Sequence, residues 1–82
     1  MKNKLAEQTF NIGKMISNYI TINNISVESA AEMAKMDVDE FRKNINEPSL
    51  ETETLRRISV ALNHNFMTDI AKIVEEEMAA NF

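Results

Sequence analysis

One short stretch, "DVDEFRKNIN", places several charged and amide side chains close together. The guanidinium of Arg42 can donate two parallel hydrogen bonds to a phosphate or to O6 and N7 of guanine, and Lys43 can contact either as a point charge. Asp39 would repel a phosphate but can accept a hydrogen bond from N4 of cytosine. Asp37 and Glu40 also have a purely local interpretation, because carboxylates near a helix N-terminus cap it and compensate its dipole. Polar recognition and local helix chemistry both remain open for this cluster.

These side chains belong to the third of five segments that have a helical pattern. Apolar residues recur at helical spacing from Ile12, and we expect this first helix to stop at Asn23 and Asn24, because Asn tolerates the left-handed conformation. Ser26 is the expected N-cap of the second segment and Asp37 that of the third, with a Glu three residues later in capping-box position. The pattern thus predicts short helices on both sides of a tight turn.

Two further helices are expected. Pro48 and Ser49 open the fourth segment, which carries an apolar stripe that includes Leu55, Ile58 and Leu62. The "NHN" at 63–65 breaks this helix, so His64 is interpreted as a turn residue rather than a catalyst or ligand. The last helix follows Phe66 and has apolar residues along one side: Met67, Ile70, Ile73, Val74 and Met78.

Composition supports an all-helical, single-domain protein. The 82 residues include one Gly and one Pro, and Ala, Met, Leu, Glu and Lys are abundant. The absence of cysteine excludes a disulfide framework and a thiolate zinc site, which fits a reducing cytoplasm. Apolar runs are only two or three residues long, so we expect neither a membrane span nor a secretion signal.

The net charge of −4 is unevenly distributed. Residues 67–82 hold four acids and one lysine, whereas residues 1–66 together carry only −1. A near-neutral head does not exclude binding to a nucleic acid; it predicts a modest affinity that falls with salt.

No catalytic or metal-binding pattern is visible. "DVDEF" begins like a calcium loop, but Arg42 stands where the loop needs Gly and Pro48 where it needs Glu. Glu75, Glu76 and Glu77 are consecutive and therefore fan around a helix instead of converging on an ion. Without a nucleophile–base pair or a phosphate loop, we expect no enzyme, no cofactor, no metal and no small-molecule ligand.

From Ile12 to Phe66 the chain resembles, without gaps, the Cro/repressor-type (lambda-repressor-like, xenobiotic-response-element) helix-turn-helix family. "NIGKMISNYI" resembles the first helix of the family, and "PSLETETLRRISVAL" resembles its fourth. Ala31 falls on the small residue of the helix crossing, Asp37 on the usual Ser or Gly cap, and Phe41 on the Val or Ile anchor. The resemblance implies an all-α, lambda-repressor-like DNA-binding domain of about five helices, with a helix-turn-helix at helices 2–3. It also implies a flexible arm at 1–9, a core at 10–66 and a C-terminal helix at 67–82.

Several positions depart from the family pattern. Lys35 replaces the usual turn Gly, and Val27 and Val38 replace Gln residues that often contact phosphate or base, which weakens direct readout. Ile20 and Ile45 stand where many members pair an Arg with a Glu. Packed hydrocarbon can replace a buried ion pair without loss of stability, so we expect these two to pack together. Asn44, at a usually apolar position, has no explanation from sequence.

The resemblance implies that the exposed flank of the third helix faces the DNA major groove. The expected DNA-binding residues are Lys35, Val38, Asp39, Arg42, Lys43 and Asn46. The expected partners are double-stranded DNA and a second copy, forming a homodimer through Ile73, Val74 and Met78. Lys2, Asn3 and Lys4 either add minor-groove contacts or belong to a disordered terminus. An alternative stays open, in which the repressor-like scaffold binds a partner protein without DNA.

Overall fold

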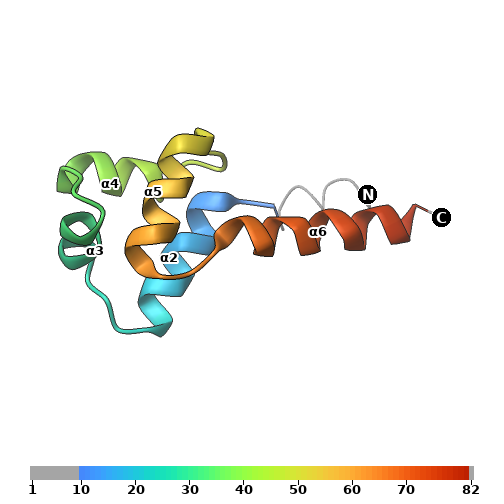
Figure 1. Ribbon diagram of the computed structural model, residues 1–82, viewed down its shortest axis with the longest axis horizontal. Helices are drawn as coiled ribbons and strands as arrows, with labels where there is room; N and C mark the ends of the chain where they lie inside the picture. Colours follow the sequence, from blue (N-terminus) through green and yellow to red (C-terminus); the bar gives the residue numbers. More distant parts are fainter. Residues whose placement is uncertain (1–9, 82) are drawn as a thin grey trace.

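The computed structural model describes residues 10–81, and within them the chain forms five α-helices and no strand (Figure 1). The helices are α2 (Ile12–Ile22), α3 (Val27–Met33), α4 (Val38–Asn44), α5 (Thr52–Leu62) and α6 (Phe66–Ala80). The all-α expectation is therefore confirmed. No helix among the described residues is long and apolar enough to cross a membrane. The Lys2, Asn3 and Lys4 arm of the sequence-based prediction lies outside the described residues.

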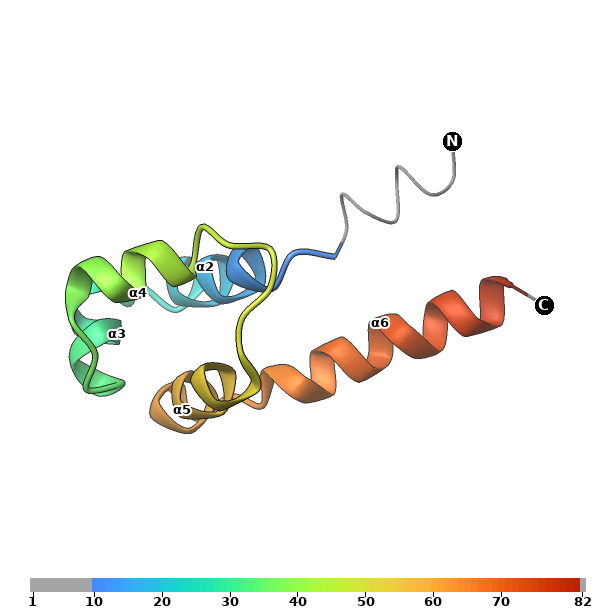
Figure 2. The ribbon, with the colours of Figure 1, turned by 90° about the horizontal axis from the view of Figure 1, so that it is seen from above.

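Four helices form a head, and α6 extends away from it. Figures 1 and 2 show α2 to α5 packed around one another, with α6 leaving the head as a single projecting rod. Within the head, α3 contacts both α4 and α5, and α5 also contacts α6. The head positions the candidate site, and only the first turns of α6 contact the head.

The helix ends follow the local chemistry that the sequence predicts. The side chains of Ser26 and Asp37 accept backbone N–H bonds at the starts of α3 and α4. Helix α2 ends at Asn23, and Asn24 has a φ of 58°. Asn63 ends α5 with a φ of 54°. Asn therefore takes the left-handed position that Gly occupies at many helix ends.

Helix α5 begins later than predicted, at Thr52 rather than at Pro48 or Ser49. The carbonyl of Pro48 instead accepts a hydrogen bond of 2.9 Å from the N–H of Ile12, and that of Glu47 accepts one of 3.0 Å from Gly13. The first N–H groups of a helix have no partner within it, so this segment satisfies the start of α2. The long-range pairing keeps Pro48 outside α5.

The core contains the apolar residues predicted from periodicity. Phe41 and Phe66 are among the largest fully buried side chains. Ile20 is 3% exposed, and Ile45 is half-buried against the same core; direct contact between the two stays a prediction. The amide of Asn44 donates to the sulfur of Met36 at 3.6 Å, which accounts for a polar residue at this half-buried position.

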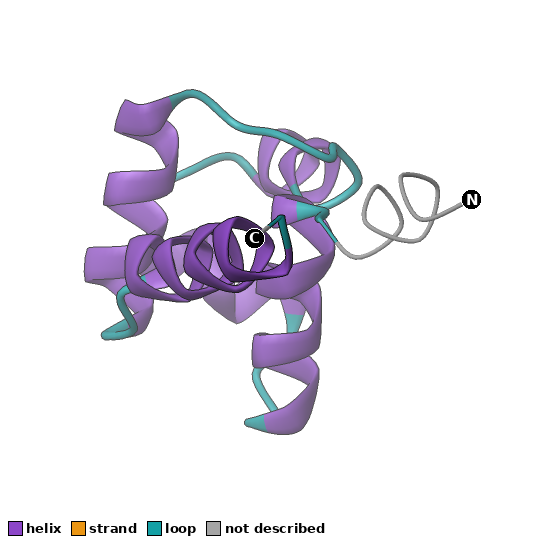
Figure 3. Ribbon diagram, turned by 90° about the vertical axis from the view of Figure 1, so that its right-hand side faces the viewer, coloured by secondary structure: helices purple, strands orange, loops and turns teal. Residues whose placement is uncertain are grey.

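The base of α6 is fastened to the head by an aromatic cluster. The ring of His64 stacks on Tyr19, with centroids 4.5 Å apart, and meets Phe66 edge-on. Nε2 of His64 also lies 2.6 Å from Oδ2 of Asp69 in the first turn of α6. Ile70, one helical turn after Phe66, also packs against the core. Figure 3, which looks along α6 toward the head, shows this helix running out in front of the others.

Candidate nucleic-acid interface

A tight turn between α3 and α4 sets the direction of α4. Lys35 has a φ of 54°, the left-handed conformation that favours Gly, and for a non-Gly residue it costs roughly 1 kcal/mol. The N–H of Lys35 donates to the carbonyl of Glu32, and that of Met36 to the carbonyl of Ala31 at 2.9 Å. Met36 is buried beneath the turn. Backbone hydrogen bonds and one apolar anchor therefore define the turn.

Arg57 of α5 braces the same turn from outside. Its Nη2 donates to the carbonyls of Ala34 and Lys35, both at 3.1 Å. These carbonyls belong to the end of α3, where no intrahelical partner exists. This role of Arg57 was not predicted from the sequence. Its only signal there is its place beside the buried stripe of α5.

Helix α4 is anchored on one side and open on the other. Phe41 is fully buried, while Asp39, Arg42 and Lys43 are exposed. Of the remaining residues in the predicted set, Lys35 and Asn46 are also exposed, at the two ends of the unit. Val38 is half-buried and packs against the core, so it contributes more to anchoring α4 than to an open surface.

Arg42 lies at the centre of the exposed flank and contacts two carboxylates. Its guanidinium is 3.4 Å from Glu28 of α3 and 3.4 Å from Asp39 of α4. Its backbone carbonyl accepts a hydrogen bond of 2.8 Å from the amide of Asn46. Glu28 lies 14 residues away in the sequence, and its pairing with Arg42 was not predicted from the sequence.

The segment of α3, the turn and α4 carries more acids than bases. Its exposed bases are Lys35, Arg42 and Lys43, and its exposed acids are Glu28, Glu32, Asp37, Asp39 and Glu40. The side chains of Arg42, Glu28 and Asp39 keep 49%, 70% and 87% of their surface exposed, so the two ion pairs are screened by water and individually weak. Such pairs can be exchanged for another anion at little cost.

The predicted dimer residues lie on α6, away from this surface. Val74 and Met78 are exposed, and Ile73 is half-buried. Among the described residues, no group of His, Cys, Asp or Glu side chains is arranged to hold a metal ion.

Comparison with known proteins finds no matching family model, no matching curated protein and no matching solved structure.

Proposed function

We propose that the protein is a sequence-specific DNA-binding transcriptional regulator, in which α3 and α4 act as a lambda-repressor-like helix-turn-helix. The observation that carries this proposal is the exposed side of α4. A short helix, held by buried Phe41 and a braced turn, presents Arg42, Lys43 and Asn46 on one open flank. A rigid helix with basic and amide side chains on its free side is suited to the major groove.

Each side chain has a distinct role in this mechanism. Arg42 leaves Glu28 and Asp39 and donates two parallel hydrogen bonds to guanine or to a phosphate. Lys43 neutralises a phosphate. Asn46 already donates to the carbonyl of Arg42, which leaves its amide oxygen to accept a hydrogen bond from the DNA. Because acidic groups surround Arg42, the affinity should be modest and should fall steeply with salt.

The test is a selection from a random duplex pool, followed by gel-shift titrations at low and moderate salt. The matched pair of variants is Lys43→Ala and Lys72→Ala, which remove the same charge from α4 and from exposed α6. The slope of log affinity against log salt is negative. We expect Lys43→Ala to make it less steep by about 1, and Lys72→Ala to leave it unchanged. The double variant R42A/K43A should lose the preference for the selected sequence. A wild-type chain without duplex preference at low salt would overturn the proposal.

A second function, as a protein-interaction module, is favoured by the pairing of Arg42. An arginine that already has two carboxylate neighbours, on a surface with more acids than bases, also suits a partner protein with basic and apolar side chains. In that case, wild type and the R42A/K43A variant would be equally inert toward DNA.

A further inference from the structure

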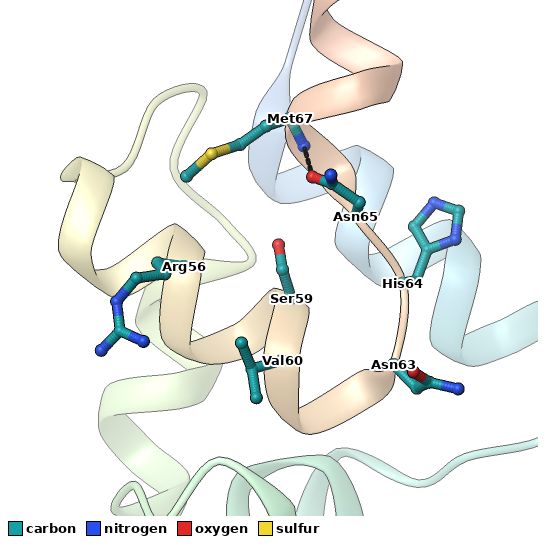
Figure 4. A pocket seen from close by; sticks show the side chains of 7 residues that line it. All are labelled: Arg56, Ser59, Val60, Asn63, His64, Asn65 and Met67. Atoms are coloured by element: carbon teal, nitrogen blue, oxygen red, sulfur yellow. Dashed lines mark hydrogen bonds between the residues drawn. The ribbon is translucent and has the colours of Figure 1, made fainter.

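Six large apolar side chains of the described residues are exposed: Ile22, Met33, Val60, Met67, Val74 and Met78. All of them except Ile22 can be connected along one surface. A depression of about 250 Å³ is lined by Met33 and Val60, and a second, of about 480 Å³, by Val60 and Met67 (Figure 4). In Figure 4 the side chain of Met67 extends from α6 toward the side of α5 that carries Arg56. We call Met33, Val60, Met67, Val74 and Met78 the apolar strip.

Helical spacing continues the strip along α6. Met67, Ala71, Val74 and Met78 follow one another at intervals of four, three and four residues, which places them on one face. Phe66, Ile70 and Ile73 form a neighbouring line, in which Phe66 is buried and Ile70 packs against the core. Ile73 thus lies on the same line as the head-facing residues. The exposed apolar face of α6 therefore includes Met67 and not Ile73.

Charge differs between the two ends of the strip. The depression between Met33 and Val60 is lined by three cations, Lys35, Arg56 and Arg57, and by no acid. Arg57 donates to backbone carbonyls. Arg56 binds Glu53 through hydrogen bonds of 3.0 and 2.7 Å, which keep the pKa of the Glu53 carboxyl below its usual range. The head end of the strip is therefore bordered by basic groups.

The far end of the strip is acidic. Glu75 and Glu77, one and three residues from Val74, flank the strip on its two sides. Glu76 and Lys72, each two residues from Val74, lie across the helix from it. A partner helix in contact with the far end thus meets carboxylates without a neighbouring lysine, and it needs basic groups of its own.

We propose that a second copy of this chain covers the apolar strip, with the two α6 helices antiparallel. The far end of each α6, at Val74 and Met78, then lies against Met67 and Val60 of the partner. This arrangement brings acidic ends to basic depressions twice, through one closed two-fold interface. A parallel arrangement would instead place both acidic ends together. The contact uses α5, α6 and the end of α3 with Lys35, but not the exposed flank of α4, so it can be measured without DNA.

Sedimentation equilibrium of the full chain tests the assembly. We expect a dimer, and we expect Val74→Glu and Val60→Glu each to weaken it by about 100-fold or more, because each introduces a carboxylate into the apolar centre of the contact twice. Ile22→Glu is the matched control, since Ile22 is 78% exposed and lies outside the strip; it should leave the dimer intact. A monomeric wild type at high micromolar concentration, or equal effects of all three variants, would overturn the proposal.

Cross-linking tests the direction of the helices and holds even if a Glu variant fails to fold. The chain has no cysteine, so Met67→Cys and Met78→Cys each introduce a single thiol. A disulfide requires Cα atoms about 4.4 to 6.8 Å apart. Under mild oxidation, the mixture of the two variants should cross-link at least about tenfold faster than Met78→Cys alone. Faster cross-linking of Met78→Cys with itself would indicate parallel helices and contradict the antiparallel arrangement.

Charge variants distinguish this partner from a purely apolar contact. Replacing Glu75 and Glu77 by Gln should weaken the dimer about three- to tenfold, whereas Glu76→Gln should leave it nearly unchanged. A tighter dimer in the first variant would mean that repulsion dominates, and would overturn the pairing of acidic ends with basic depressions.

Discussion

Arg42 is the residue on which both proposed functions depend. Its neighbours Glu28 and Asp39 hold the guanidinium in place, yet both pairs are exposed and 3.4 Å long. A phosphate or a guanine edge would have to displace these carboxylates, so they compete with the ligand while they orient the side chain. If the protein binds DNA as proposed, the acids on and beside α4 lower its affinity without excluding binding.

Removing the competing carboxylates should strengthen DNA binding. We expect the variant E28Q/D39N to bind its selected duplex about threefold more tightly or better, because two negative charges leave the neighbourhood of the phosphates. The measurement is a gel-shift titration at low salt. Glu76→Gln, which removes one distant charge, is the control and should change little. Unchanged or weaker binding by E28Q/D39N would argue against the placement of α4 in the groove.

At the scale of the element, the start of α2 depends on a single glycine. A Cβ atom added at Gly13 would lie 2.3 Å from the carbonyl oxygen of Glu47 and 2.7 Å from that of Ile45. These oxygens belong to the backbone after α4, which cannot retreat as a flexible side chain can. Gly13 therefore permits the close approach by which this backbone accepts the first N–H groups of α2.

Substitution at this position should destabilise the head. We expect Gly13→Ala to lower the free energy of unfolding by about 2 kcal/mol or more, through overlap with backbone atoms. Thermal or urea unfolding followed by circular dichroism measures the change. Lys14→Ala, at the exposed neighbouring position of the same helix, should have little effect. Equal stability of the two variants would contradict the close approach described here.

The helices and caps could be predicted because they depend on neighbours in the sequence. Ser26, Asp37 and the two asparagines after α2 act within three or four residues of their own positions, and the pattern of apolar residues identified the core. Lys35 stands where the family that the sequence resembles usually has Gly, and its φ of 54° is the left-handed conformation that favours Gly.

The remaining features depend on residues that are far apart in the chain. The start of α5 was placed too early because the Pro48 carbonyl pairs with Ile12, 36 positions away. The contacts of Arg57 with the turn and of Glu28 with Arg42 join different helices in the same way. Periodicity shows which side of a helix is apolar, but not which part of that side faces the head. The sequence therefore could not show that Ile73 lies on the head-facing line of α6 and Met67 on its exposed face.

For the whole molecule, the main feature is the separation of head and α6. The aromatic cluster around His64 and the packing of Ile70 hold only the first turns of α6 against the head. The rest projects, with its acids, away from the compact part (Figure 2). Among the described residues, none of α6 beyond Ile70 packs against the core, which leaves the end of α6 open to contact with another molecule.

A shortened chain should separate folding from assembly. We expect a protein that ends at Lys72 to keep Phe66 and Ile70 in the core, to unfold cooperatively and to sediment as a monomer, since Val74 and Met78 are lost. Circular dichroism and sedimentation velocity measure the two properties. A shortened chain that still dimerises would place the contact elsewhere, and one that fails to fold would show that the head needs all of α6.

The brace from Arg57 has a consequence for how freely this protein can change. Arg57 binds main-chain oxygens of residues 34 and 35, which every amino acid supplies, so its hold does not depend on which side chains stand there. A turn that would otherwise rely on the conformational freedom of glycine is kept in shape from a neighbouring helix. Position 35 is thereby released to carry a lysine, and the turn can vary in sequence while it keeps its geometry.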